Sequence, residues 1–215
     1  LLTQLVTYTN PDKPQNKKAL EQFHLLKVIA DFVRLYRCAP SVLKFKHEVI
    51  ENNGGKNSIL RYLLKDLLPY PCNPSLREVV KNPAISARLP TSRMTAYLLC
   101  TLCLTNYAEV FEEVNELMSS FKFDATISPL RTLHAVADFI FSLIANKTNR
   151  ARTSSERICK IMNRYGIVSA LTEGLGKFDL NHPDAPEVTN AVLKPIELLV
   201  RMSGAKKAKE SDLDN

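Results

Sequence analysis

The sequence predicts an all-α protein, and three of its features support that prediction. Apolar residues recur at spacings of three and four along most of the chain, which is the period of an amphipathic helix. No strand-like alternation of apolar and polar residues survives over more than four residues. Turn-forming residues divide the helical stretches into pairs, a pattern typical of a stacked α-solenoid of the armadillo or HEAT kind. An irregular helical bundle is the alternative, because no repeat consensus recurs at a period of about 40 residues.

The first long helix is predicted from about Gln15 to Cys38. It follows the break formed by Pro11-Asp12-Lys13-Pro14 and ends before Pro40, because a proline lacks the amide and disfavours a helical residue before it. Ser41 can cap a short helix that extends to about Glu51. The long helix carries two apolar stripes and is therefore expected to pack on two sides. One stripe comprises Leu20, Phe23, Ile29 or Ala30, and Val33, and the other comprises Leu25, Val28, Phe32 and Leu35.

Asn52-Asn53-Gly54-Gly55 is the strongest turn signal in the chain. The helix after it ends at Pro69 and has a dense apolar face, formed by Ile59, Leu60, Leu63, Leu64, Leu67 and Leu68. Five prolines over residues 69–90 predict a long loop or linker. A further helix is expected from Thr91 and continues through residues 110–121, with Glu112, Glu113 and Glu116 facing water.

The cleanest amphipathic stripe begins after Pro129, a residue that suits the first turn of a helix. Its members are Leu130, Leu133, Ala137, Ile140, Phe141 and Ile144. Thr153 and Glu156 predict a capping box at the start of the next helix, which Tyr165-Gly166 ends.

A short helical segment is expected over residues 168–175. The last helix is predicted from about Pro186 to Met202, with Val188, Val192, Leu199 and Met202 inward. Pro195 inside it predicts a kink or a local break. We therefore expect one helical region over residues 1–203, with the proline-rich loop near 69–90, and a disordered charged tail over residues 204–215.

The net charge and its distribution limit the kinds of partner that the chain is expected to bind. The net charge of +7 sits in the first 90 residues, which hold 14 Lys and Arg against 7 Asp and Glu. This excess could attract acidic proteins or nucleic acid, but acidic residues are interleaved and no block of five like charges occurs. Nucleic-acid binding is therefore expected to be weak.

No run reaches the roughly 18 apolar residues that a membrane span needs, so no membrane partner is expected. Five irregularly spaced cysteines indicate the cytoplasm or the nucleus rather than an oxidising compartment.

No motif predicts catalysis. Cys100-x-x-Cys103 lies within an apolar helical stretch without a nearby charge, so two buried thiols are expected rather than a redox or zinc site. His24, His47, His134 and His182 stand far from each other and from any cysteine, which favours structural roles. Gly174-Leu175-Gly176 follows a helix rather than a strand, so we interpret it as a helix carboxy-terminal cap rather than a phosphate loop. No catalytic, cofactor-binding or metal-binding residue is therefore assigned, and no cofactor is expected.

Two stretches carry a resemblance to a known family. The first stretch contains residues Leu25 to Tyr36, with the sequence LLKVIADFVRLY, and residues Ser58 to Pro69, with the sequence SILRYLLKDLLP. The second stretch contains Phe178-Asp179-Leu180 and the helix after it, which includes Lys194-Pro195. Both resemble the helical-repeat region of the giant HECT-domain ubiquitin ligases of the Mule type, also called ARF-binding protein. Residues 71–123 diverge from the family's pattern.

The resemblance implies an armadillo-like solenoid segment of a HECT-type E3 ubiquitin-protein ligase, in the cytoplasm, the nucleus or both. In that family the ubiquitin-accepting cysteine lies in a HECT domain, and no residue of this chain matches its motif. This segment is thus expected to be a non-catalytic scaffold that recruits protein substrates and contacts neighbouring helical repeats, while the parent chain supplies the transferase activity. The alternative is a stand-alone helical adaptor that binds peptide or nucleic acid through its basic first half.

Overall fold

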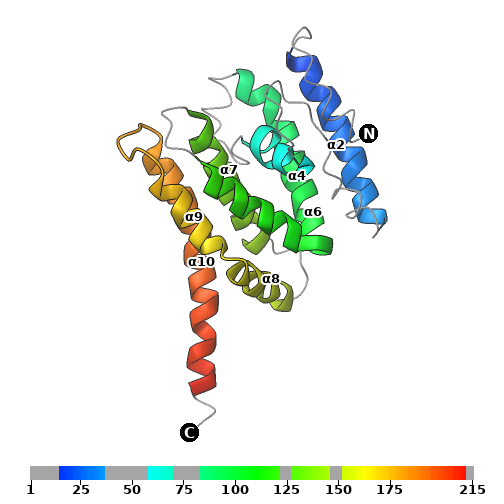
Figure 1. The fold of residues 1–215 in the computed structure, drawn as a ribbon. Coiled ribbons are helices and arrows are strands. Elements are labelled where there is room, and N and C mark those ends of the chain that lie inside the picture. The colour runs from blue at the N-terminus through cyan, green and yellow to red at the C-terminus, as the bar shows by residue number, and fades with distance from the viewer. Residues whose placement is uncertain (1–14, 37–57, 70–82, 122–126, 146–151, 212–215) are drawn as a thin grey trace. The chain divides into compact units, whose positions relative to one another are not determined.

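The computed structural model describes residues 15–36, 58–69, 83–121, 127–145 and 152–211, and all regular structure in these ranges is helical (Figure 1). The all-α prediction is therefore confirmed. The predicted break at 11–14, the short helix from Ser41 to Glu51 and the turn at 52–55 lie outside the described residues. The helices are α2 (Gln15–Leu35), α4 (Ile59–Tyr62), the π-helix η1 (Leu63–Leu67), α6 (Pro83–Ser120), α7 (Ile127–Ala145), α8 (Arg152–Arg164), α9 (Ile167–Gly176) and α10 (Ala185–Ser211).

The chain divides into two compact units rather than the one region expected over residues 1–203. The first unit comprises Leu1–Glu113 and the second comprises Val114–Asn215, so the boundary falls inside α6.

In the first unit, α4 and η1 form one continuous helical stretch. All six apolar residues predicted for its face are buried, namely Ile59, Leu60, Leu63, Leu64, Leu67 and Leu68. The amide of Leu68 donates to the carbonyl oxygen of Leu63 over 2.9 Å, and this bond across five residues is the π-helical pattern. The stretch ends just before Pro69, as predicted.

Helix α2 buries one apolar stripe, formed by Leu26, Ile29, Ala30 and Val33. Gln22 Nε2 donates to the hydroxyl oxygen of Tyr62 over 3.4 Å and thereby connects α2 to α4. Burial, reinforced by the nearby carboxylate of Asp66, raises the pKa of Tyr62 to about 12, while Arg88 acts in the opposite direction. This phenol is therefore a neutral, buried hydrogen-bonding group at neutral pH.

Helix α6 begins at Pro83 and includes Pro90, so the predicted start at Thr91 is wrong. Pro90 is exposed, and a proline within a helix removes one backbone hydrogen bond. Thr91 and Ser92, which follow it, are buried. Ser92 is buried and its Oγ donates to the carbonyl oxygen of Leu68 over 3.0 Å, which satisfies a carbonyl at the end of η1.

A polar cluster joins the start of α4 to α6 within the first unit. Ser58 caps α4, because its Oγ accepts a hydrogen bond of 3.0 Å from the amide of Arg61. The same hydroxyl donates to Glu113 Oε2, and Arg61 Nη1 lies 3.6 Å from Glu113 Oε1. Glu113 was expected to face water, but its side chain is largely buried. The prediction failed because the partners of Glu113 lie more than 50 residues away in sequence.

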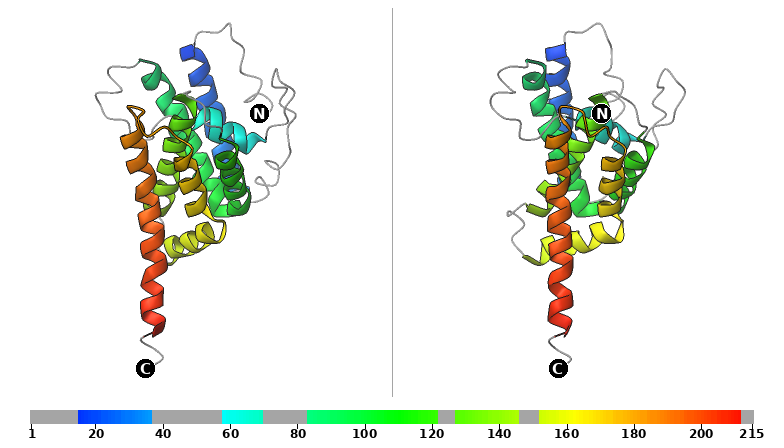
Figure 2. Two further views of the ribbon diagram at one scale, coloured as in Figure 1. Left: turned by 60° about the vertical axis from the view of Figure 1, so that its left-hand side comes forward. Right: turned by 90° about the vertical axis from the view of Figure 1, so that its left-hand side faces the viewer.

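The second unit is arranged around α7, which contacts α8 and α9 and packs most extensively against α10. The amphipathic stripe predicted for α7 is confirmed, since Leu130, Leu133, Ala137, Ile140 and Ile144 are buried; Phe141 is half-buried. Figures 1 and 2 show α8 lying crosswise to α10.

Gly166 connects α8 to α9 and has a positive φ of 68°. Its amide donates to the carbonyl oxygen of Asn163 over 3.1 Å, so Gly166 closes α8 as predicted, in the left-handed conformation that glycine adopts without steric cost. The start of α8 differs from the prediction, because Arg152 is already helical and Thr153 is not the capping residue.

Gly174 and Gly176 lie in the last turn of α9, so the helix ends where predicted; the capping residue is Lys177, whose amide donates to the carbonyl oxygen of Gly174 over 3.2 Å. A Cβ atom at Gly174 would lie 3.1 Å from both Leu133 Cδ1 and Met118 Sδ. Gly174 therefore permits the close approach of α9 to α7 and to the end of α6. The helix ends at Gly176, and Lys177 follows it with a negative φ.

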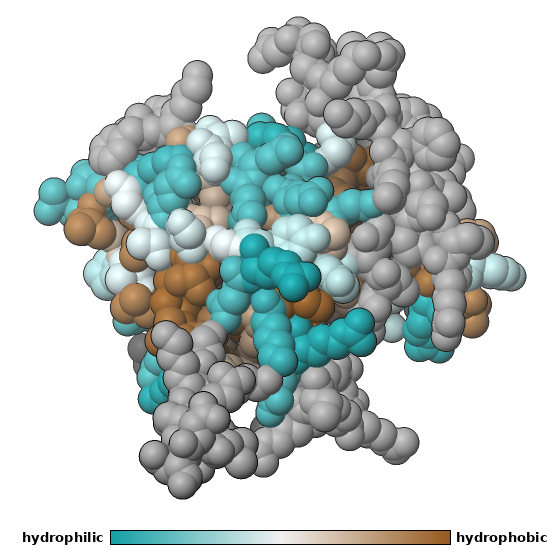
Figure 3. Space-filling model, turned by 60° about the horizontal axis from the view of Figure 1, so that its bottom comes forward, coloured by the Kyte–Doolittle hydropathy of each residue, from teal (hydrophilic) through white to brown (hydrophobic). Residues whose placement is uncertain are grey.

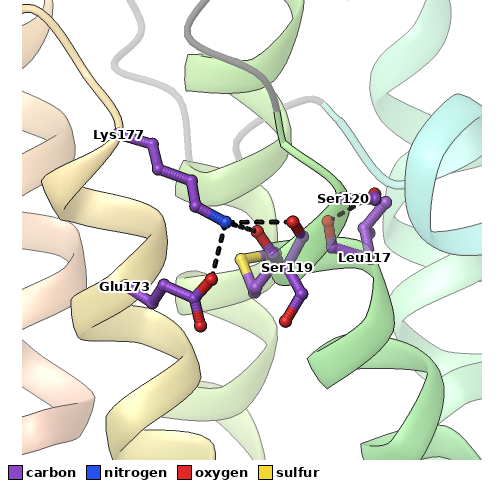
Figure 4. Close-up of polar contacts among 6 residues, drawn as sticks. Leu117, Ser119, Ser120, Glu173 and Lys177 are labelled. Carbon is purple, nitrogen blue, oxygen red and sulfur yellow. Dashed lines mark hydrogen bonds and ion pairs between the residues drawn. The ribbon is translucent and has the colours of Figure 1, made fainter.

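Lys177 also caps the carboxy terminus of α6 (Figure 4). Its Nζ atom donates to the carbonyl oxygens of Met118 and Ser119 over 3.1 and 3.0 Å, and it lies 2.7 Å from Glu173 Oε1. A cation at this position binds carbonyl groups that have no partner within the helix and interacts favourably with the helix dipole.

Helix α10 continues through Pro195 without interruption and reaches Ser211. Val188, Val192 and Leu199 are buried as predicted, whereas Met202 is half-buried. Residues 204–211 are therefore helical, although a disordered tail was expected there. In Figure 2 the red carboxy-terminal part of α10 extends past α8.

Candidate protein-binding surface

The thiols singled out in the sequence are placed where nucleophilic chemistry is disfavoured. Cys103 is buried and Cys100 is half-buried in α6. Burial, and then proximity to Cys100, raises the pKa of Cys103 well above its ordinary value. Burial, and then the charge of Glu156, raises the pKa of Cys159 to about 11. Both thiols therefore remain protonated at neutral pH, and the thiolate is the reactive form.

The described histidines occupy separate positions. His24 is exposed on α2, with its ring centroid 5.5 Å from that of Phe23. His134 Nε2 lies 3.7 Å from Asp138 Oδ2 on α7. His182 lies in the loop before α10, where its Nδ1 accepts from the amide of Asp184 over 3.2 Å. Among the residues that the structure describes, no three His, Cys, Asp or Glu side chains gather as a metal site would require. His47 lies outside these residues.

A second apolar face of α2 reaches the surface. We call it the outer face of α2 and define it by Leu25, Val28, Phe32, Leu35 and Tyr36. Val28, Phe32, Leu35 and Tyr36 are 49%, 50%, 70% and 52% exposed, and Leu25 is half-buried. The rings of Phe32 and Tyr36 contact each other with centroids 4.6 Å apart. This stripe was predicted from the sequence, together with the expectation that it packs within the protein.

The outer face of α2 exposes an apolar area comparable with the largest patch on a typical monomer. Aromatic side chains carry about 150–250 Å² of surface each, so the half-exposed Phe32 and Tyr36 alone present on the order of 200 Å². With Val28 and Leu35 the apolar area is on the order of 400 Å². The largest apolar patch on a typical monomer is about 300–600 Å² and is often functional.

A smaller apolar face lies on α10. Leu193 and Val200 are 49% and 57% exposed, and Ile196 between them is half-buried. The spacing of four and three residues places all three on one side of the helix. An ion pair of 2.5 Å between Arg201 and Glu197 borders this side.

Leu180 is also 70% exposed, in the loop between α9 and α10. It differs from the outer face of α2 because it stands in a short polar turn, where Asp179 Oδ1 accepts from the amide of Asn181 over 2.9 Å. Figure 3 shows brown apolar areas at the surface between hydrophilic teal ones.

Within the described parts of the chain, no helix combines the length and the apolar character needed to cross a lipid bilayer.

Sequence reasoning missed the cluster of Ser58, Arg61 and Glu113 and the cap that Lys177 forms on α6. Ser58 before an apolar run was a detectable capping signal. Nothing in the local sequence indicates the partner of Lys177, because Met118 lies 59 residues away.

Comparison with known proteins finds similarity to E3 ubiquitin-protein ligases over most of the chain. The chain is related to a segment of E3 ubiquitin-protein ligases. It is 23% identical to E3 ubiquitin-protein ligase UPL1 and 23% identical to E3 ubiquitin-protein ligase UPL2, both of Arabidopsis thaliana. Each match covers 89% of this chain, and the chain spans 6% of the length of each relative. No protein-family profile and no solved structure matches the chain.

Proposed function

We propose that this chain is a non-catalytic scaffold segment of a HECT-type E3 ubiquitin-protein ligase of the Mule type, and that it helps to recruit protein substrates. The observation that carries the proposal is the similarity to two E3 ubiquitin-protein ligases over 89% of the chain. Its partners would be protein substrates and neighbouring helical repeats of the longer chain, in the cytoplasm, the nucleus or both.

The described residues support a scaffold role in two ways. They form helices only, as the repeats of an α-solenoid do. The outer face of α2 also exposes four large apolar side chains, which is the composition of a protein-binding surface rather than of a catalytic pocket. The mechanism is geometric, because a substrate bound to the scaffold is held close to a distant catalytic domain and so reacts at a raised effective concentration.

The experiment uses the full-length protein that contains this segment. The variant replaces Phe32 and Leu35 by serine, and quantitative profiling of ubiquitinated lysines in cells compares it with the unchanged protein. A subset of substrates should lose ubiquitination, while transfer of ubiquitin from a charged E2 enzyme to the full-length protein stays unchanged. Loss of the transfer step itself, or an absence of any transfer by the unchanged protein, would contradict the proposal.

A further inference from the structure

We infer that α10 carries a redox-sensitive switch, in which oxidation of Met202 to its sulfoxide loosens the contact between α10 and α8. Cys159 on α8 and Met202 on α10 meet at this contact, and the Sγ atom of Cys159 donates to the Sδ atom of Met202 over 3.2 Å. Such a switch does not depend on the proposed ligase role, because it requires only the packing of these two helices within the second unit.

Met202 lies where α10 leaves its neighbours. Val188, Val192 and Leu199 are buried earlier in the helix, and Met202 follows Leu199 on the same side, at a spacing of three residues. In Figure 2 the carboxy-terminal part of α10 extends past α8. The sulfur contact therefore holds α10 close to the point where the helix passes beyond α8.

Met202 is the member of the pair that an oxidant attacks. Oxidation of a cysteine proceeds through the thiolate, but burial, and then the charge of Glu156, raises the pKa of Cys159 to about 11. The thiol therefore stays protonated at neutral pH, whereas a thioether needs to lose no proton before it reacts. Met202 is also half-buried, while Met118 and Met162 are fully buried.

The oxidant is a peroxide. The Sδ atom of Met202 attacks one peroxide oxygen, the oxygen–oxygen bond breaks and a sulfur–oxygen bond forms, so the sulfur loses two electrons and hydrogen peroxide is reduced to water. The sulfoxide is polar where the thioether was apolar. The two sulfur atoms are already in contact, so the new oxygen does not fit between them, and burial without a hydrogen bond is unfavourable. The side chain should turn toward water, and its contact with Cys159 should open.

The first experiment measures which methionines react. The 215-residue chain is treated with dilute hydrogen peroxide, and its four methionines are followed by peptide mass spectrometry. Met202 and the half-buried Met94 should gain oxygen about tenfold faster than Met118 and Met162. If Met202 reacts as slowly as the two buried methionines, the inference is wrong.

Hydrogen exchange measures the effect on α10. After oxidation the amides of residues 199–205 should exchange about fivefold faster, and methionine sulfoxide reductases should restore the original rate. Met202→Leu keeps the apolar volume without the oxidisable sulfur and should abolish the response. Met94→Leu is the matched control and should retain it. A response that survives in Met202→Leu, or that the reductases do not reverse, overturns the inference.

Two further variants test whether the sulfur contact is responsible. Met202→Gln places a polar side chain of similar length at the contact and should accelerate exchange without peroxide. In Cys159→Ala the sulfur contact is absent from the start, so oxidation of Met202 should accelerate exchange less than in the unchanged chain. Unchanged exchange in Met202→Gln, or a full response in Cys159→Ala, would show that this contact does not control α10.

Discussion

The ammonium group of Lys177 lies 3.1 Å from the carbonyl oxygen of Met118 and so connects the residue after α9 to the carboxy-terminal turn of α6. A second bond reaches the carbonyl oxygen of Ser119, and Glu173 completes the contacts of the ammonium group. The two carbonyls belong to the last turn of α6, where intrahelical partners are missing. One side chain therefore connects the carboxy-terminal turn of α6 to the residue that follows α9.

Replacing Lys177 by methionine should lower the free energy of unfolding by about 1–2 kcal/mol, because the charge-assisted hydrogen bonds to two carbonyls are lost while the aliphatic stem is kept. Hydrogen exchange should become faster in the last turn of α6. Lys194→Met changes an exposed lysine on α10 and serves as the control. Equal stability of the two variants in urea denaturation would contradict the capping role.

Gly174 and Gly176 form a matched pair at the end of α9. A Cβ atom at Gly174 would lie 3.1 Å from Leu133 and Met118 side-chain atoms, whereas one at Gly176 would meet nothing within 4 Å. Gly174→Leu should therefore destabilise the protein by about 1–3 kcal/mol through overpacking. Gly176→Leu should be neutral or slightly stabilising. The measurement is thermal and urea unfolding of both variants, and a similar loss in the two would contradict the packing role of Gly174.

Glu113→Ala should lower the free energy of unfolding by about 1–3 kcal/mol, because Ser58 and Arg61 lose their shared partner in a mostly buried position. Glu112→Ala is the control, since it removes the same side chain from an exposed position one residue earlier. Urea unfolding compares the two variants. A loss of stability that is the same for both would show that general charge, and not the cluster, accounts for the effect.

Stability should fall as the pH rises above 9. The pKa of Cys159 is about 11 in the folded protein against an ordinary value of 9.0. Below pH 9 the thiol is protonated in both states, and its contribution to stability is fully present. Between pH 9 and 11 the unfolded chain loses the proton first, so the free energy of unfolding declines. Cys159→Ala should show a shallower decline over this range. An identical pH profile for the variant and the unchanged protein would contradict the raised pKa.

Nucleic-acid binding should be weak and steeply dependent on salt. The basic excess of the first 90 residues can attract phosphates non-specifically, with a dissociation constant of about 10⁻⁴–10⁻⁶ M at physiological salt. Anisotropy with a labelled single-stranded oligonucleotide between low and physiological salt measures both quantities. Nanomolar binding with a steep salt slope would favour the stand-alone adaptor over the ligase scaffold.

Particular helices show why some structural features could be predicted from the sequence and others could not. The buried face of residues 59–68 and the stripe of α7 were predicted because each is a local pattern with the helical period. Gly166 was predicted as a helix end because a tyrosine-glycine pair after a periodic stretch is a local stop signal. The start of α6 at Pro83 was missed, because the buried residues after Pro90 outweigh its local tendency to break a helix.

The sequence by itself determined that this chain is helical, which residues of each helix are apolar, and that α2 has two apolar stripes, because helical periodicity is a property of neighbouring residues. Only the tertiary structure decided which of those stripes is covered, since burial depends on segments far apart in the chain. It buried Leu26 and Val33 and left Phe32 and Leu35 exposed to solvent. The same reason explains Glu113 and Lys177, whose partners are about 55 and 59 residues distant and leave no local signal.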